Sequence, residues 1–181
     1  AILAAVFLYL DPQIPDAETY RHYQLETPLR IYADGGELLA EFGNRRLIPI
    51  ESQDIPQYFK DALVYTEDKR FYEHGGVDWI SLANDVVKLL VNSTVLTGAS
   101  TITMQLPRNV ADLSREQTFV RKFKEMLLAL KIEQELSKEE ILELYINVVP
   151  FGKRAYGLQA AAYTYYGNPA EQLNLPQLAM L

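Results

Sequence analysis

Two glutamates in this chain have neighbours that suit acid–base chemistry. The first, Glu67, lies in the stretch VYTEDKRFYEHGGVDW. If this stretch is helical, the side chains one turn away, Leu63 and Phe71, are apolar. Apolar surroundings desolvate a carboxylate and raise its pKa toward that of a working base or acid. The pattern alone leaves two interpretations open: Glu67 moves a proton, or it is a surface glutamate paired with Lys69 or Arg70.

The second glutamate, Glu125, follows two cations on the same predicted helix. Arg121 lies four residues before it and Lys122 three before. Such pairs contribute only a few tenths of a kcal/mol at a surface. However, Leu128 and Ile132 share the face of Glu125, which indicates burial, and a buried charge needs a partner or a ligand. Both interpretations stay open on the pattern alone.

Other candidate polar side chains are less specific. His74 precedes paired glycines and suits a structural or a functional role. The hydroxyls of Ser100, Thr101 and Thr103 suit helix caps or ligand contacts, and spacing does not decide between them. The sequence contains no metal-ligand spacing and no phosphate-cradling glycine loop with its lysine.

These residues require elements to position them, and the pattern is mostly helical. Two apolar runs around Asp34, Gly35 and Gly36 predict a small hairpin. Residues 97–109 lack a period and contain Pro107, which predicts a loop or a broken helix. Helices are predicted over residues 57–71, 78–92 and 158–167, and after two capping boxes, Ser114 with Gln117 and Ser137 with Glu140.

Composition bounds the class of protein. The chain has 181 residues, about half of them hydrophobic, which suits one domain or one domain with an appendage. Its net charge of −7 argues weakly against a nucleic-acid surface, and the absence of cysteine excludes a disulfide scaffold and a cysteine nucleophile. The opening AILAAVFLYL is too short to span a bilayer alone. We interpret it as the last part of a membrane helix; the alternative is a buried N-terminal helix.

Taken together, five ordered motifs resemble those of the peptidoglycan glycosyltransferases, which polymerise lipid II in bacterial cell-wall synthesis. The motifs are EDKRFYEHGG, GASTITMQ, RKFKE, KEEILELYIN and RAYGLQAAA, and the resemblance covers about residues 56–181. It implies a mainly α fold, with a lysozyme-like helical head and a smaller membrane-associated jaw. Residues 1–10 then end a transmembrane helix and 11–55 form a connector with the hairpin. As in class A penicillin-binding proteins, a transpeptidase domain is expected beyond Leu181.

The resemblance also implies roles for individual residues. Glu67 matches the catalytic glutamate and Glu125 the second essential one. Asp68, Phe71 and His74 match positions that shape the site. The remaining positions implied to bind the substrate, or the phosphoglycolipid inhibitor moenomycin, are Ser100, Thr101, Thr103, Gln105, Arg108, Arg121, Lys122 and Asn147.

The reaction so implied joins lipid II to a growing glycan strand with inversion and release of undecaprenyl pyrophosphate. A divalent cation, Mg or Mn, on the pyrophosphate is a further expectation, and Glu125 either helps to hold it or orients the cations. The expected location is the bacterial cytoplasmic membrane, in a single-pass protein whose catalytic domain faces the periplasm. Other cell-wall synthesis proteins are expected as partners, and nucleic acid is not. The alternatives are a lysozyme-like glycan hydrolase and a non-catalytic lipid II-binding module.

Two further features concern the membrane and the departures from the family pattern. The predicted helix 78–92 has more apolar residues than one narrow stripe needs, so it is expected to dip into lipid; the alternative is a fully buried helix. The departures are Ala99, Met104, Pro107 and Pro150, and RNVADLS is one residue longer than the usual spacing. They concern donor-site contacts and leave both glutamates in place.

Overall fold

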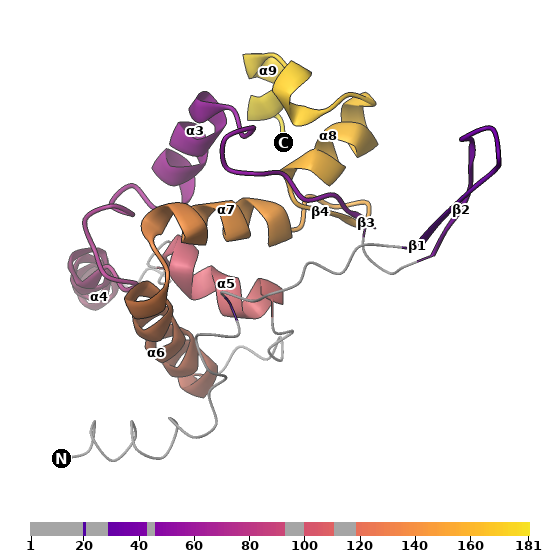
Figure 1. Ribbon diagram of the computed structural model, residues 1–181. Helices are drawn as coiled ribbons and strands as arrows, with labels where there is room; N and C mark the ends of the chain where they lie inside the picture. The colour runs from indigo at the N-terminus through magenta and orange to yellow at the C-terminus, as the bar shows by residue number, and fades with distance from the viewer. Residues whose placement is uncertain (1–19, 21–28, 43–45, 93–99, 111–118) are drawn as a thin grey trace. The chain divides into compact units, whose positions relative to one another are not determined.

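The computed structural model describes residues 20, 29–42, 46–92, 100–110 and 119–181 (Figure 1). This part of the chain is mainly helical, which confirms the predicted class. The elements in chain order are β1 Leu29–Tyr32, β2 Leu38–Phe42, β3 Arg46–Leu47, α3 Gln57–Glu67, α4 Trp79–Asn92, α5 Ile102–Val110, α6 Phe119–Glu135, α7 Lys138–Val148, β4 Ala155–Tyr156, α8 Leu158–Tyr166, the 3₁₀ turn η2 Ala170–Gln172 and α9 Leu175–Ala179.

The chain divides into two compact units. The first comprises Ala1–Tyr23 and Leu63–Ile141, and the second comprises Gln24–Ala62 and Leu142–Leu181. The division falls inside α3 and inside α7. All residues predicted to do chemistry belong to the first unit except Asn147.

In the first unit, α5 packs against α6, as Figure 1 shows. The prediction of a loop or broken helix is wrong for residues 102–110, which form α5 with Pro107 inside it. Proline removes one helical hydrogen bond, but Ile102 and Leu106, one turn apart, are both completely buried. Packing of this apolar face therefore outweighs the weak local signal.

Helix α3 ends at Glu67 instead of continuing to Phe71. Beyond it the chain turns, with Phe71 N bonded to Asp68 O at 2.9 Å. At the end of this loop Gly76 has φ +94°, and a Cβ there would lie 2.6 Å from the carbonyl oxygen of Ala129 on α6. The loop therefore lies directly against the α6 backbone, which only glycine permits.

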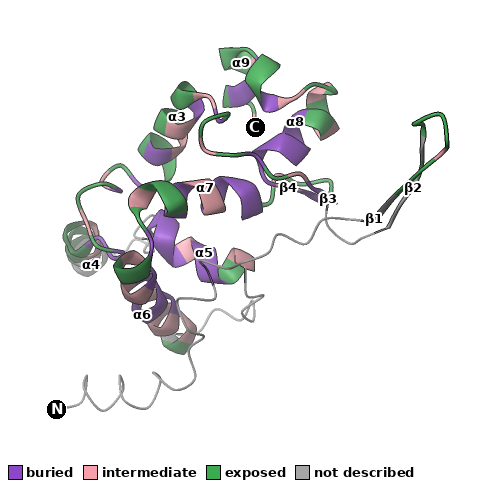
Figure 2. Cartoon of the chain, viewed as in Figure 1, coloured by how far each residue is buried: buried purple, intermediate pink, exposed green. Residues whose placement is uncertain are grey.

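Helix α4 forms where it was predicted, and its described side chains are partly or fully exposed. None of its described side chains is buried (Figure 2). Trp79, Ile80 and Val87 are each more than half exposed. The alternative of a fully buried helix is therefore wrong for the described side chains of α4. The side chains of Val86, Leu89, Leu90 and Val91 lie outside the description.

The capping box before α7 is confirmed. Ser137 N donates to Oε2 of Glu140 at 2.7 Å, and Glu140 N donates to Oγ of Ser137 at 3.3 Å. The other predicted box, at residues 114–117, and the apolar residues 1–10 lie outside the described residues. Within the described ranges no helix is both long and apolar enough to cross a bilayer.

The second unit contains both small sheets. β1 pairs antiparallel with β2 through a tight turn where the hairpin was predicted, and β3 pairs parallel with β4. Asn147 is buried; its Oδ1 accepts from Ile50 N and its Nδ2 donates to Ile50 O, both at 2.9 Å. These bonds tie α7 to the segment after β3. A two-residue turn, Lys153 (φ 47°) and Arg154 (φ 64°), precedes β4.

Candidate active site

Glu67 ends α3 with an exposed carboxylate. The Gln105 side chain, on α5, donates a hydrogen bond from Nε2 to Oε2 of Glu67 at 3.1 Å. The expectation that apolar neighbours desolvate Glu67 is therefore wrong. The expectation fails because α3 ends at Glu67, so Phe71 does not follow Glu67 on the same helix.

The alternative of a simple surface ion pair does not describe Glu67 either. Among the described residues, Arg70 pairs with Glu73 at 2.9 Å, and the Lys69 ammonium lies 4.5 Å from the centre of the Tyr65 ring. Glu67 thus combines an accessible carboxylate with a neutral donor. This arrangement suits a group that accepts a proton from a bound hydroxyl.

Asp68 and His74 form a buried pair in the loop after Glu67. Nε2 of His74 lies 3.0 Å from both carboxylate oxygens of Asp68, and both side chains are at most 5% exposed. Oδ2 of Asp68 also accepts a bond from Ile102 N at 3.1 Å, in the first turn of α5. The pair therefore holds the loop to the helix that carries Gln105.

The three predicted hydroxyls differ in their surroundings. Thr101 is buried, donates to Gly76 O at 2.6 Å and accepts from Met104 N at 3.1 Å, which is a helix cap. Thr103 is buried and donates to Oε1 of Glu133 at 2.7 Å. Both hydroxyls are therefore engaged within the protein. Ser100 is partly exposed.

Glu125 is buried among cations, as its pattern predicted. It is 4% exposed, and its carboxylate lies 3.2 Å from Nε of Arg121 and 3.5 Å from Nζ of Lys122. Nζ of Lys122 also donates to Oγ of Ser100 at 2.5 Å. The structure thus brings together residues from α6 and from the segment before α5.

The electrostatics of Lys122 identify a net positive cluster. Burial lowers the pKa of Lys122; Glu125 opposes this by attraction, while the positive charges of Arg108 and Arg121 lower the pKa further. Arg121 and Lys122 thus lie against one carboxylate, and Arg108 adds a third positive charge near Lys122. An anion bound there would relieve their mutual repulsion.

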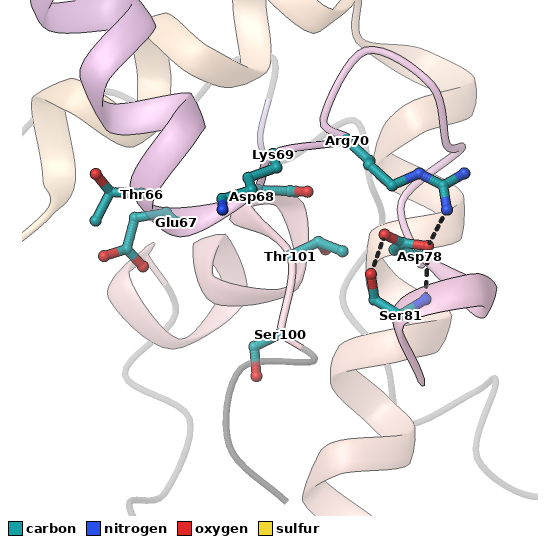
Figure 3. Close-up of a pocket in the computed structure, with 9 residues that line it drawn as sticks. All are labelled: Thr66, Glu67, Asp68, Lys69, Arg70, Asp78, Ser81, Ser100 and Thr101. Carbon is teal, nitrogen blue, oxygen red and sulfur yellow. Dashed lines mark hydrogen bonds and ion pairs between the residues drawn. The ribbon is translucent and has the colours of Figure 1, made fainter. Parts of the chain in front are cut away.

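A pocket of about 340 Å³ lies beside Glu67. Figure 3 shows Glu67 at one end of its lining and Arg70, Asp78 and Ser81 at the other. The remaining lining residues are Thr66, Asp68, Lys69, Ser100 and Thr101. This volume falls in the lower part of the range for small-molecule sites.

Asp78 is a site residue that the sequence reasoning missed. Its Oδ1 accepts from Ile80 N and Ser81 N, both at 3.1 Å, and its Oδ2 accepts from the Ser81 hydroxyl at 2.6 Å. Burial alone would raise the pKa of Asp78, but these bonds and the Arg70 charge together lower it. An aspartate just before the periodic run of α4 is an N-cap signal that could have identified it.

The described residues do not fit a divalent-cation site at Glu125. Arg121 and Lys122 already occupy its carboxylate, and positive charge there repels a metal ion. No group of three or more acidic or histidine side chains with suitable geometry occurs within the described ranges.

Comparison with known proteins identifies a matching family and several similar sequences. The transglycosylase family profile matches residues 35–181. Similar curated proteins include penicillin-binding protein 1A of Pseudomonas aeruginosa, 47% identical over 98% of this chain, and of Escherichia coli, 45% identical over 97%. The protein of the same name from Vibrio cholerae is 42% identical over 97%. The chain spans 22%, 21% and 21% of the lengths of these three relatives, respectively.

Proposed function

The chain belongs to the transglycosylase family, the peptidoglycan glycosyltransferases that its motifs predict, and from this premise we propose that it polymerises lipid II. In the proposed step, the 4-hydroxyl of the acceptor's N-acetylglucosamine attacks C1 of the donor's N-acetylmuramic acid. The bond from C1 to the pyrophosphate oxygen breaks, and undecaprenyl pyrophosphate leaves with the bonding electrons. A single displacement inverts C1 and gives a β-1,4 link.

Glu67 is the general base in this proposal, and its geometry is the observation that carries it. The attacking hydroxyl must lose a proton as the new bond forms. Glu67 offers an exposed carboxylate beside a pocket, and Gln105 fixes one of its oxygens at 3.1 Å. Within the part of the chain that the structure describes, the other oxygen accepts no hydrogen bond and can meet a hydroxyl bound in the pocket.

The cationic cluster supports a pyrophosphate leaving group. Arg121 and Lys122 lie against the one negative charge of Glu125, and Arg108 adds a third positive charge near Lys122. Guanidinium and ammonium groups stabilise phosphate oxygens as negative charge develops. A glycan hydrolase needs instead a proton donor to its neutral leaving group. The cluster therefore favours the transferase over the hydrolase, and we assign Glu125 the role of orienting these cations.

The decisive experiment compares Glu67→Gln with Glu139→Gln, an exposed glutamate on α7, in polymerisation of lipid II. The amide keeps the size of Glu67 but cannot accept the proton, so we expect polymer to fall to background with an unchanged melting temperature. Glu139→Gln should behave like the wild type. Near-normal turnover in folded Glu67→Gln would contradict the assignment. If the protein acts on finished glycan alone, it is a hydrolase. If it binds lipid II without forming polymer, it is a binding module.

The exposed face of α4 supports a site that opens at the membrane. Trp79, Ile80 and Val87 are 57%, 56% and 58% exposed. Burying apolar surface in the lipid interface is favourable, and the lipid tail of the substrate requires such a position. We propose that α4 belongs to a membrane-associated jaw. Residues 1–10 would then end a single membrane helix of the cytoplasmic membrane, with residues 11–55 as connector, 56–181 as a periplasmic catalytic domain and a transpeptidase domain beyond. Moenomycin and other cell-wall synthesis proteins are the proposed further partners.

A pair of substitutions on α4 tests the membrane proposal. Ile80→Asp with Val87→Asp should weaken binding to phospholipid vesicles and lower turnover of membrane-bound lipid II. Because both side chains are exposed, the protein should stay folded. Asn84→Asp adds a charge at an exposed polar position of the same helix and serves as the control. Unchanged vesicle binding in the folded double variant would overturn the proposal.

A further inference from the structure

A buried cluster outside the pocket lining joins four segments of the first unit. Glu133, near the end of α6, accepts a hydrogen bond from Thr103 on α5 at 2.7 Å. Its Oε1 also lies 2.7 Å from Nζ of Lys138, at the start of α7. That ammonium lies 4.4 Å from the centre of the Phe71 ring, in the loop after Glu67. One ion pair therefore contacts α5, α6, α7 and the loop.

Burial makes these contacts specific. The side chains of Glu133 and Lys138 are 8% and 21% exposed, while Phe71 and Thr103 are fully buried. A cation over an aromatic ring and a charge-assisted hydrogen bond are both strengthened away from water. Phe71 is therefore not available to touch substrate, and it acts as the anchor of the loop.

We propose that Lys138 and Glu133 are positioning residues for Glu67, an inference that rests on the proposed glycosyltransferase function. Lys138 holds the loop through Phe71, and Glu133 holds α5 through Thr103. Glu67 precedes that loop, and Gln105 on α5 donates to it at 3.1 Å. The ion pair thus fixes the loop after Glu67 and helix α5 relative to each other. Their relative position sets the geometry of the Glu67–Gln105 bond.

The chemistry requires such fixation because the base must meet a hydroxyl proton at hydrogen-bond distance. A displacement of about 1 Å can lower the rate of a positioned reaction by up to roughly a hundredfold. Lys138→Met keeps the length of the side chain and removes the charge. We expect it to lower kcat about tenfold or more while the apparent KM for lipid II stays within about twofold. Lys138→Arg keeps a cation over the ring and should restore most of the rate.

The test is a double-mutant cycle for kcat in the intact protein, measured well below the melting temperatures. Gln105→Ala should lower kcat in the wild-type background, and by at least about threefold less when Lys138→Met is already present. Residues that act independently have additive effects. The control cycle, Glu139→Gln with Gln105→Ala, should be additive. Additive behaviour with Lys138→Met, or no rescue by Lys138→Arg, would overturn the proposal and leave Lys138 as a purely structural residue.

A measurement without turnover separates this inference from the proposed function. Hydrogen exchange at the amides of Ile102 and Gln105 should be faster in Lys138→Met than in Glu139→Gln, since α5 loses its tie to α6 and α7. If the wild type makes no polymer but exchange changes in this way, the proposed function fails and the fixation of α5 stands. Unchanged exchange would refute the fixation whatever the activity.

Discussion

Replacing Glu125 with glutamine tests whether this carboxylate is the counter-ion of the cationic cluster. The substitution keeps the volume of the side chain, so it leaves no cavity. It removes the negative charge from between Arg121 and Lys122, at 3.2 and 3.5 Å. Removing one partner of a fully buried ion pair costs about 3–5 kcal/mol. The side chains of Arg121 and Lys122 are 18% and 36% exposed, so water screens the remaining charges.

We therefore expect Glu125→Gln to lower the free energy of unfolding by about 2 kcal/mol. For a chain of this size that corresponds to a melting temperature lower by roughly 4–8 °C. Urea unfolding followed by far-UV circular dichroism measures the change, with Glu139→Gln as the surface control. A loss no larger than that of the control, combined with lost polymerisation, would refute the counter-ion role and place Glu125 in the chemistry alone.

Three further predictions concern charge and backbone strain. Because burial lowers the pKa of Lys122, its ammonium loses its proton at a lower pH than that of a free lysine, so moenomycin affinity should fall by roughly tenfold as pH rises through the alkaline range. Calorimetry should show no such fall in Lys122→Arg, because arginine stays charged. Although burial raises it, the bonds from Ser81 and the Arg70 charge hold the pKa of Asp78 below that of a free aspartate, so its stabilisation is present at neutral pH and is lost as the solution becomes strongly acidic. Asp78→Asn should lose this pH-dependent part of the free energy of unfolding, about 1 kcal/mol. Urea unfolding at several pH values measures it, and a pH profile like that of the wild type would contradict the capping role. Arg154→Gly should raise the free energy of unfolding by about 0.5 kcal/mol, because glycine adopts the positive φ at lower cost; a lower melting temperature would show that contacts of the arginine side chain outweigh the strain.

The sequence predicts the parts of this fold that have strong local signals. The capping box of Ser137 and Glu140 reports the start of α7 because two side chains satisfy two backbone donors reciprocally. The burial of Glu125 follows from apolar residues on its own helical face, and Leu128 and Ile132 are indeed buried with it. Each of these two signals involves residues that are close together in the sequence.

Features decided by contacts between distant segments were not predictable in this way. The α5 helix depends on packing against α6, which outweighs Pro107 and a run of small hydroxyl residues. The exposure of Glu67 depends on where α3 ends, and the periodic pattern continues past that point to Phe71. The pairing of Glu133 with Lys138 joins residues five apart across a helix break, and its contact with Phe71 is visible only in three dimensions.

The paired glycines after His74 look equivalent in the sequence, but the fold gives them different freedom to vary. A Cβ at Gly75 would meet nothing within 4 Å, whereas one at Gly76 would collide with the Ala129 carbonyl. In a library of all single substitutions, we expect many residues to survive at Gly75 and almost none at Gly76. The loop that follows Glu67 therefore fits against the backbone of α6 only with glycine at position 76. A graft of this loop from a relative would fit only if the donor also has glycine at that second position.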